Sequence, residues 1–496
     1  MKKAGKFVYI AGFFIIVCAV GFALNYYGVF DSGGIAPFGG SNDTVTVSLD
    51  EWHGWKPVVD ANHGLGQSKQ GSPYHNMGLN VDIRVINDDE EALQAFIAGD
   101  VVAIGLSVNE WAYVHARLRQ ENVSGRMVMM TDRSTGGDGI VTTADITSIE
   151  GLYGHRIAVS KNSAAHVMLE WLLKTSGLTA AQTDEIKRDM VYTNSTEETF
   201  EALVSGQAEA AALWEPYITL AERQANAKIL FSTKSASNLM IDGIVFREDY
   251  LNKYPDKAAD FIKGALSSIR RYESNYEYIR QFEDYSGLSN AEIRAMSDLV
   301  SFANFADNVD LFDGTVQILY REMAEIWMSL GEATLPNGED TAFDSSFLLR
   351  LQSDFANDSL TTDNYNQNGG QINTDTDTLL RRTLTINFSP NVAVITEDSY
   401  PALNEFANIA KILSGSIIRV EGNIADTGIG DTDTGRLLSE QRAKAVCDFL
   451  INLGIDDTRF VYAGNGISKP VPELDPRSEE GMRANRRTDI FFIRVE

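Results

Sequence analysis

Cysteine is almost absent from this 496-residue sequence, which contains only Cys18 and Cys447. Two cysteines so far apart cannot form the network of disulfides that holds small secreted domains together. The folded parts must therefore be stabilised by packing, and 44% hydrophobic residues provide enough apolar material for several cores.

Positive charge is also scarce, because 42 Lys and Arg residues face 69 Asp and Glu residues, which gives a net charge of -27. Such a chain repels phosphate backbones, so nucleic acid is excluded as a partner. The six histidines have no metal-ligand spacing, and neither a phosphate-binding loop nor a nucleophile elbow occurs. We expect no metal, no cofactor and no enzymatic activity.

Long apolar runs are confined to the N-terminus, where 18 residues from Phe7 to Leu24 follow Lys2, Lys3 and Lys6. This length approaches the hydrocarbon thickness of a bilayer, and the lysines favour a cytoplasmic Met1. The sequence therefore predicts one transmembrane helix within residues 1–30, in the inner membrane, with the bulk of the chain periplasmic or otherwise extracytoplasmic.

A cleaved signal peptide is the alternative, because small residues at Ala19, Gly21 and Ala23 offer cleavage-like spacing. A lipoprotein is less well supported, since Cys18 follows Val17 in the middle of the apolar run.

Two polar segments divide the rest of the chain. Residues 31–43 are rich in Gly, Ser and Asp, and residues 346–378 are mostly polar, with Gly369 and Gly370 near the middle of their polar core. Both compositions are typical of flexible linkers. We therefore expect one domain at 44–345 and another at 379–496.

The region 44–345 alternates short apolar segments with amphipathic ones, a pattern that predicts an α/β fold with mostly parallel sheets. Strands are expected at Thr44–Leu49, Val81–Ile86, Val101–Ser107, Arg126–Met130, Arg156–Ser160 and Ala227–Phe231. Ser195 and Glu198 have the spacing of a helix capping box, and Tyr254–Leu330 is predicted to be nearly all helix.

Two stretches of this region resemble periplasmic solute-binding proteins of the nitrate, sulfonate, taurine and thiamine-precursor type. The first contains Gly154–Val159, Asn162–His166 and the apolar helix Val167–Leu173. The second, Glu201–Ala211, leads into Leu213–Pro216. The resemblance implies a two-lobe periplasmic-binding-protein-like fold (type II) with a small-molecule ligand in the cleft, and an ABC-type permease is a possible partner.

Ligands of open parallel sheets bind beyond the carboxyl ends of the strands, so the loops that follow the strands supply the candidates. The expected ligand-binding residues are Trp52, Trp55, Ser107, Asn109, Ser134, Thr135, Asn162, Ser163, Trp214, Glu215 and Asp242. Each also has a structural interpretation: the tryptophans as core anchors, Asn162 and Ser163 as helix caps, the carboxylates as ion-pair partners. Acidic and aromatic candidates outnumber basic ones, which favours a cationic or heteroaromatic ligand over nitrate or sulfonate.

Residues 379–496 resemble the α+β OmpA/MotB-like domain that associates with peptidoglycan. The similar segments are Ile386–Phe388 as first strand, Leu403–Leu413 as first helix, Ile418–Gly422, Leu438–Val446, Gly464–Gly466 and Asn485–Asp489. The resemblance implies that Arg442 binds a peptide-stem carboxylate, and Arg486 is a further expected peptidoglycan-binding residue. Ala425 stands where the family has an aspartate that accepts from ammonium, so Asp426, Asp431 or Asp433 would have to replace it.

The sequence thus predicts a solute-binding protein for transport or sensing, tethered to membrane and cell wall. The alternative is a structural or sensory envelope protein that has a ligand-free binding-protein fold and a degenerate OmpA-like domain for protein contacts. A flagellar stator subunit would need a carboxylate within Phe7–Leu24, and none is present.

Overall fold

The computed structural model describes residues 44–271, 275–332, 341–361, 378–389, 391–427, 432–472 and 474–493. The predicted membrane segment 1–30, the linker 31–43 and Asp431 lie outside the described residues. Within the described ranges, no helix has both the length and the apolar character needed to cross a membrane.

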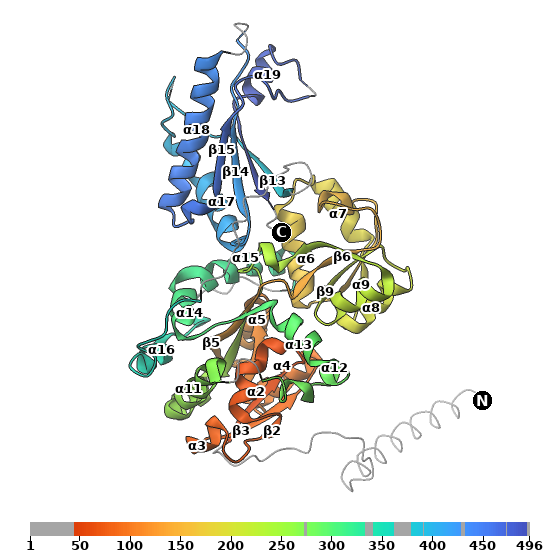
Figure 1. Ribbon diagram of the computed structural model, residues 1–496, viewed down its shortest axis with the longest axis vertical. Helices are drawn as coiled ribbons and strands as arrows, with labels where there is room; N and C mark the ends of the chain where they lie inside the picture. The colour runs from red at the N-terminus through yellow and green to blue at the C-terminus, as the bar shows by residue number, and fades with distance from the viewer. Residues whose placement is uncertain are drawn as a thin grey trace, which may run out of the picture. The chain divides into compact units, whose positions relative to one another are not determined.

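Two sheets form the region that precedes the C-terminal domain, as Figure 1 shows. The seven-stranded sheet of the larger lobe has the order β12-β5-β11-β4-β1-β3-β2, and the five-stranded sheet of the smaller lobe has the order β10-β6-β9-β7-β8. The two-lobe α/β fold expected from the sequence is confirmed. The prediction of mostly parallel sheets was wrong, because β5, β11, β12, β2, β6 and β10 pair antiparallel with their neighbours.

The larger lobe contains β1 Thr44–Leu49, β2 Gly66–Gln67, β3 Asn80–Val85, β4 Ala103–Ser107, β5 Gly125–Ser134, β11 Ile241–Arg247 and β12 Val300–Phe302. Its helices are α2 Lys56–Asn62, α3 Pro73–Asn76, α4 Asp89–Ala98, α5 Val108–Gln120, α10 Glu248–Lys253, α11 Pro255–Arg271, α12 Glu283–Ser286, α13 Asn290–Ser297, α14 Phe305–Asp310, α15 Val316–Ser329 and α16 Ser346–Leu351. Strand β1 pairs in parallel with β3 and β4, and five of its six residues are buried. Burial on both faces explains its nearly continuous apolar sequence.

The smaller lobe contains β6 Asp138–Thr142, β7 Ile157–Ser160, β8 Val191–Thr193, β9 Ala210–Trp214 and β10 Lys228–Ser232. Its helices are α6 Ala164–Thr175, α7 Ala180–Arg188, α8 Thr196–Val204 and α9 Tyr217–Ala225, which lie around the sheet in Figure 1. The chain enters this lobe between β5 and β6 and returns between β10 and β11. The two lobes are therefore joined at two short connections, which is the arrangement that hinge closure requires.

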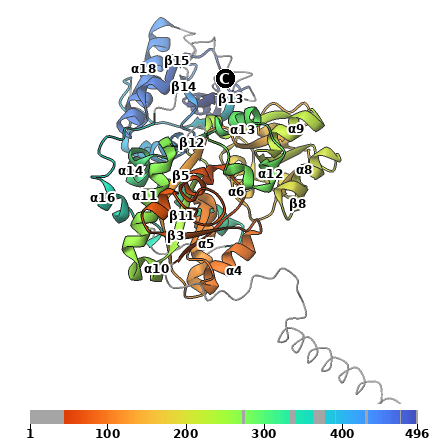
Figure 2. The ribbon, with the colours of Figure 1, turned by 60° about the horizontal axis from the view of Figure 1, so that its bottom comes forward.

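Part of the segment Tyr254–Leu330, which follows the return of the chain to the larger lobe, also contacts the smaller lobe. Glu292 of α13 forms an ion pair with Arg223 of α9 at 2.8 Å, and Figure 2 shows α12 and α13 beside α8 and α9. This segment was predicted to be nearly all helix, but Val300–Phe302 adds a short strand at the edge of the larger sheet, paired with β5. Three residues are too few for a sequence pattern to distinguish, and their pairing is set by the tertiary fold.

Part of the predicted linker 346–378 belongs to the folded domain. Helix α16 lies within it, the Phe355 ring stacks on Phe305 with centroids 5.3 Å apart, and the Thr361 N–H donates to Asp307 at 2.7 Å. Residues 362–377 of the predicted linker lie outside the described residues.

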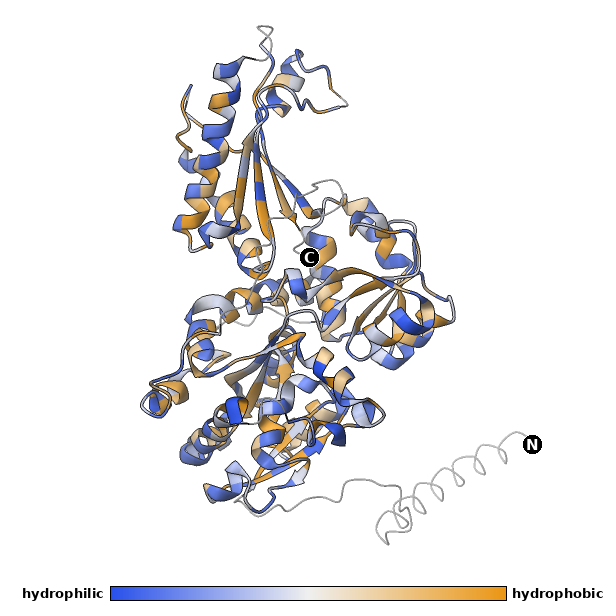
Figure 3. Cartoon of the chain, viewed as in Figure 1, coloured by the Kyte–Doolittle hydropathy of each residue, from blue (hydrophilic) through white to orange (hydrophobic). Residues whose placement is uncertain are grey.

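The C-terminal domain is α+β, with a four-stranded sheet in the order β13-β16-β14-β15. Its elements are β13 Thr378–Leu384, α17 Tyr400–Ile412, β14 Ile417–Gly422, α18 Asp433–Asn452, β15 Phe460–Gly464, α19 Glu479–Ala484 and β16 Thr488–Ile493. In Figure 3 the strands are largely hydrophobic, whereas hydrophilic residues mark the outer faces of the helices.

The prediction of Ile386–Phe388 as the first strand was wrong, because β13 ends at Leu384 and Phe388 makes only an isolated bridge with Ile395. Arg381 and Arg382 interrupt the apolar pattern of the true strand. Both are compensated by carboxylates, Asp489 at 3.6 Å and Glu405 at 3.4 Å.

Candidate functional site

The main candidate site is a cavity of about 420 Å³ at the carboxyl ends of the parallel strands of both lobes. Asp50 to Trp52 follow β1, Asn87 and Asp89 follow β3, and Ser107 ends β4. From the smaller lobe, Ser160 ends β7, residues 194–197 follow β8, and Trp214 ends β9. The cavity therefore lies beyond the carboxyl ends of strands in both sheets, where ligands of open sheets bind; we call this expectation the strand-end rule.

Carboxylates dominate the lining of this cavity. We define the acidic cleft by its nine acidic lining residues: Asp50, Glu51, Asp89, Glu110, Asp138, Glu197, Asp242, Glu283 and Asp284. None of the described lining residues is Lys, Arg or His. The cleft therefore presents a strongly negative potential to a ligand.

Glu110 is held in place by the start of α5. Ser107 is the N-cap of this helix and forms a complete capping box with Glu110, whose carboxylate accepts from the Ser107 N–H at 3.1 Å and from its hydroxyl at 3.0 Å. The same carboxylate also accepts from the backbone N–H of Ala164, in the first turn of α6. A side chain of the larger lobe thus binds the N-terminus of a helix in the smaller lobe.

Burial and mutual repulsion raise the pKa values of the innermost carboxyls. Burial, followed by repulsion from Asp132, raises the pKa of Asp138 to about 7. Burial and then repulsion from Asp132 and Asp138 raise the pKa of Asp242 well above its usual range. These carboxyls are therefore partly protonated at neutral pH, and a nearby positive charge would favour their ionised forms.

Aromatic rings form the remaining wall of the cleft. The Trp52 and Trp214 rings meet edge to face with centroids 5.9 Å apart, and Trp214 makes the same kind of contact with Tyr217 at 5.9 Å. The Trp52 indole N–H donates to Asp132 at 3.3 Å, and the Trp214 indole donates to Thr196 at 2.7 Å. Both indoles are therefore fixed, with part of their surface facing the cavity.

The structure brings together some of the residues expected from the sequence. Trp52, Ser107, Ser163, Trp214 and Asp242 line the cavity.

The other expected residues lie outside the lining. Trp55 is buried and its indole N–H donates to Asp50, so it fixes a lining carboxylate rather than contacting the cavity. The Glu215 carboxylate accepts from both the N–H and the hydroxyl of Thr219. The Ser134 hydroxyl lies 2.7 Å from that of Thr233.

The backbone explains the positions of the last three expected residues. Asn109 is the second residue of α5 and is fully buried, and its carbonyl accepts from the Trp327 indole at 2.8 Å. Thr135 donates its N–H to the Leu299 carbonyl at 2.8 Å, and Asn162 adopts a left-handed conformation with φ of 62° just before α6.

Sequence reasoning missed most of the acidic cleft. Asp50 and Asn87 directly follow expected strands, so the strand-end rule could have found them. Glu283 and Asp284 follow no strand of the sheets that form the cleft, since they belong to α12. Their backbone N–H groups donate to Glu51 at 3.1 and 2.9 Å, a tertiary contact without a sequence signal.

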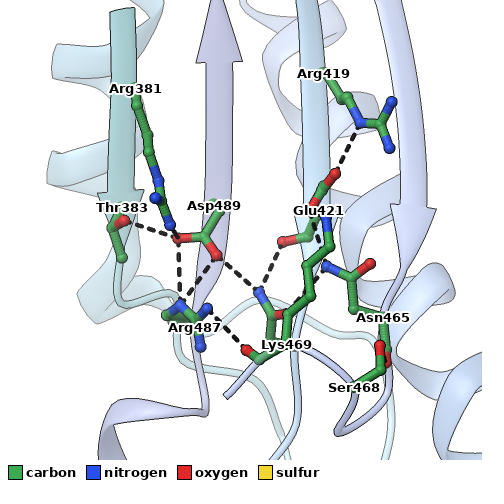
Figure 4. A network of polar contacts seen from close by, with 10 residues as sticks. Arg381, Thr383, Arg419, Glu421, Asn465, Ser468, Lys469, Arg487 and Asp489 are labelled. Atoms are coloured by element: carbon green, nitrogen blue, oxygen red, sulfur yellow. Dashed lines mark hydrogen bonds and ion pairs between the residues drawn. The ribbon is translucent and has the colours of Figure 1, made fainter. Parts of the chain in front are cut away.

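The C-terminal domain has a second polar site, drawn in Figure 4. Glu421 of β14 and Asp489 of β16 are register partners, and each is only 1% exposed. Asp489 accepts from Thr383 at 2.7 Å and from Asn423 at 3.1 Å, and pairs with Arg487 at 3.0 Å.

Glu421 is neutralised by cations at both of its oxygens. It pairs with Arg419 at 2.8 Å and Lys469 at 2.7 Å, and accepts from Asn465 at 2.9 Å (Figure 4). Burial alone would raise the pKa of Glu421, but the Lys469 and Asn465 contacts and the two positive charges hold it below its usual range. This network fixes the loop after β14, where the expected peptidoglycan-binding residues begin.

The expected peptidoglycan-binding residues form two separate groups. The Arg442 guanidinium donates to the Val392 carbonyl at 3.3 Å and covers the Phe388 ring at 4.9 Å. Burial and then the nearby Arg486 lower the pKa of Arg442, which places two cations close together. Asp426 instead pairs with Arg477 at 2.9 Å, so its carboxylate is already neutralised.

Comparisons with known proteins give the relationships of both domains. Residues 75–295 match the family model described as ABC transporter, phosphonate, periplasmic substrate-binding protein, and residues 387–486 match that of the OmpA family. The taurine-binding periplasmic protein of Escherichia coli (strain K12) is 23% identical over 216 residues. This match spans 43% of the present chain and 64% of that protein.

Solved structures with a similar fold include two sulfonate-binding proteins. The alkanesulfonate-binding protein SsuA from Xanthomonas axonopodis pv. citri, bound to MOPS, is 15% identical, with a TM-score of 0.46, 60% of this chain covered and 95% of that one. The periplasmic aliphatic sulphonate binding protein SsuA from Escherichia coli is 14% identical, with a TM-score of 0.48 and coverage of 62% and 99%.

Both matched families consist of binding domains rather than enzymes. The chain combines a periplasmic ABC substrate-binding domain of the sulfonate, taurine and phosphonate type with a C-terminal OmpA domain.

Proposed function

We propose that this protein captures a small molecule between its two lobes in the extracytoplasmic space and delivers it to an ABC-type permease. The observation that carries the proposal is the cavity of about 420 Å³ at the strand ends of both sheets. Its size suits a metabolite, and its walls combine aromatic surface with many polar groups, most of them carboxylates.

Closure of the lobes would complete the site. In the part of the chain that the structure describes, the lobes are connected at residues 135–137 and 233–240, so a rotation about these connections moves whole lobes without disturbing either sheet. Trp52 belongs to one lobe and Trp214 to the other, and their rings are in edge-to-face contact across the cleft.

The ligand screen that tests capture uses the full chain in detergent. Amines, nucleobase-like compounds and oxyanions are tested for a rise in melting temperature, because a ligand at 100 times its Kd stabilises the native state by about 2.7 kcal/mol. A ligand that binds one to one in the cavity supports the proposal. A chain that stays unshifted with every class would favour the ligand-free structural alternative.

We also propose that residues 7–24 remain as a single-pass inner-membrane anchor. The support is their apolar length and the lysines before them. Protease should reach residues 44–496 from the extracytoplasmic side only, and N-terminal sequencing should begin at Met1 or the next residue. A mature N-terminus near Phe22 or Leu24 would mean a cleaved signal peptide.

The C-terminal domain is proposed to hold the protein to peptidoglycan. Arg442 and Arg486 form a pair of cations suited to a peptide-stem carboxylate. The pairing of Asp426 with Arg477 raises the question of which group accepts from the stem ammonium. Sedimentation of the domain with purified sacculi tests the proposal, and a domain that stays in the supernatant would indicate a protein contact instead.

A further inference from the structure

The start of α6, a position in the cleft that could favour an anionic ligand, already faces a carboxylate. A helix N-terminus offers free N–H groups and a positive dipole end to an anion. At the start of α6, however, the Ala164 N–H donates to the Glu110 carboxylate. An anionic ligand there would have to displace Glu110 and would then lie among uncompensated carboxylates, which is electrostatically unfavourable.

One buried carboxylate lacks the partner that its burial calls for. Asp138 lines the cavity and is only 6% exposed, yet its Oδ2 has no hydrogen-bond partner in the described structure. Buried polar atoms are normally hydrogen-bonded, so an unpaired oxygen beside a cavity indicates a missing donor. The charged neighbours that face Asp138 are Asp50, Glu110 and Asp132, all of them acidic.

The missing donor is organic rather than a bare metal ion. Within the described ranges, no three His, Cys, Asp or Glu side chains are close enough together to hold a metal. Trp52, Trp214 and Tyr217 add apolar and π surface to the wall, which suits the methylene groups of an ammonium ligand and attracts its charge.

The carboxylates form two sets along the cleft. Asp242 is the register partner of Ser107, whose hydroxyl donates to Glu110. After burial, repulsion from Asp132, Asp138, Glu110 and Asp50 raises the pKa of Asp242, and we call the lining residues Asp50, Glu110, Asp138 and Asp242 the inner set. Glu51 accepts from the backbone N–H groups of Glu283 and Asp284. After burial, repulsion from Glu51, Glu197 and Glu283 raises the pKa of Asp284, and these four residues are the outer set. One positive charge could lie in only one set and would leave the other uncompensated.

We propose that the ligand is an organic cation with at least two ammonium groups, an aliphatic di- or polyamine, whose ends lie in the inner and outer carboxylate sets. This rests on the proposed function and specifies its substrate class. The inner ammonium group donates to Asp138 Oδ2, the alkyl chain lies along the Trp52 and Trp214 rings, and the second ammonium group lies near Asp284.

Titration calorimetry with the full chain in detergent tests the substrate class. 1,4-Diaminobutane and the triamine spermidine are compared with butylamine, which has one ammonium group, and with taurine, methanesulfonate and inorganic phosphate. We expect one-to-one binding of the di- and triamine, at least tenfold weaker binding of butylamine, and affinity that falls as salt is raised. Butylamine binding as tightly as the diamine would overturn the two-charge assignment.

The titrations with anions distinguish a failure of the diamine proposal from a failure of the proposed solute capture. Binding of taurine or methanesulfonate without any amine would overturn the cation assignment and leave solute capture intact. Failure of both classes to bind the folded protein would count against both.

Three matched Asp→Asn variants test whether the amine binds in the acidic cleft. Asp138→Asn and Asp284→Asn keep the side-chain shape, and each should weaken amine binding about 10- to 100-fold, the effect of losing a charge-assisted hydrogen bond. The control Asp145→Asn removes the same charge from a side chain of the smaller lobe that is 98% exposed, and it should leave the Kd unchanged. Equal effects of all three variants, with circular dichroism confirming the fold, would show that only net charge matters and would refute the site.

Discussion

Binding of an amine to the acidic cleft should release protons and should strengthen as pH rises from 6 to 8. Burial, followed by neighbouring carboxylates, raises the pKa of Asp138 to about 7 and that of Asp284 to about 6. A bound ammonium group favours the ionised carboxylates, so their protons leave as the ligand enters. The aliphatic amine keeps its charge over this range.

The magnitude follows from the two pKa values. At pH 6, a carboxyl with a pKa of about 7 is about 90% protonated, and ionising it weakens binding roughly 11-fold, against about 1.1-fold at pH 8. A carboxyl with a pKa of about 6 contributes a factor of roughly 2 at pH 6. The Kd should therefore fall about 20-fold between pH 6 and pH 8, and further if Asp89 and Asp242, whose pKa values are also raised, ionise on binding.

Calorimetry at pH 7 in two buffers with different ionisation enthalpies counts the protons directly. We expect net release of at least about half a proton per amine bound, because a carboxyl with a pKa near 7 is half protonated at that pH. Asp138→Asn should remove about tenfold of the pH dependence. An affinity that is constant or falls with pH, or identical heats in both buffers, would refute the reasoning.

The remaining predictions concern stability and the wall. The unliganded protein should become less stable as pH rises through 7, because Asp138 has a folded pKa of about 7, far above that of an unfolded aspartate, so the folded state binds more protons; the melting temperature should fall from pH 6 to pH 8. Asp489→Ala leaves Arg487 buried without its carboxylate, and should lower the unfolding free energy of residues 379–496 by about 3 to 5 kcal/mol in urea titrations. The exposed control Asp448→Ala should stay within about 0.5 kcal/mol. Arg442→Ala should weaken sedimentation with sacculi about 10- to 100-fold, and an unchanged pellet would exclude it from the binding site.

The sequence predicted the regular part of the fold well. Thr44–Leu49 is the strand that the structure has, and Val81–Ile86 differs from β3 by one residue at each end. These strands are buried and apolar, so local composition alone identifies them. The predicted capping box of α8 is only half formed. The Ser195 hydroxyl accepts from the Glu198 N–H as expected, but the Glu198 carboxylate accepts from the Asn194 N–H, one residue before the N-cap.

The candidate site was only partly predictable, because its residues depend on contacts between distant segments. Ser107 and Trp214 follow from the strand-end rule. Trp55, in the same turn as Trp52, points into the core, and no local pattern distinguishes the two indoles. Glu283 and Asp284 enter the cleft because α12 folds against Glu51, 232 residues away from Glu283 in the sequence.

Closure of the lobes around a ligand is the central claim, and energy transfer between them tests it most directly. Labels are attached at Glu91→Cys on the larger lobe and Asp145→Cys on the smaller lobe, both exposed positions, in a full chain with Cys18 and Cys447 replaced by serine. The account predicts that saturating spermidine shifts the chain to a single population with a changed, narrowly distributed distance between the labels. An unchanged distribution at a ligand concentration that calorimetry shows to be saturating would contradict it.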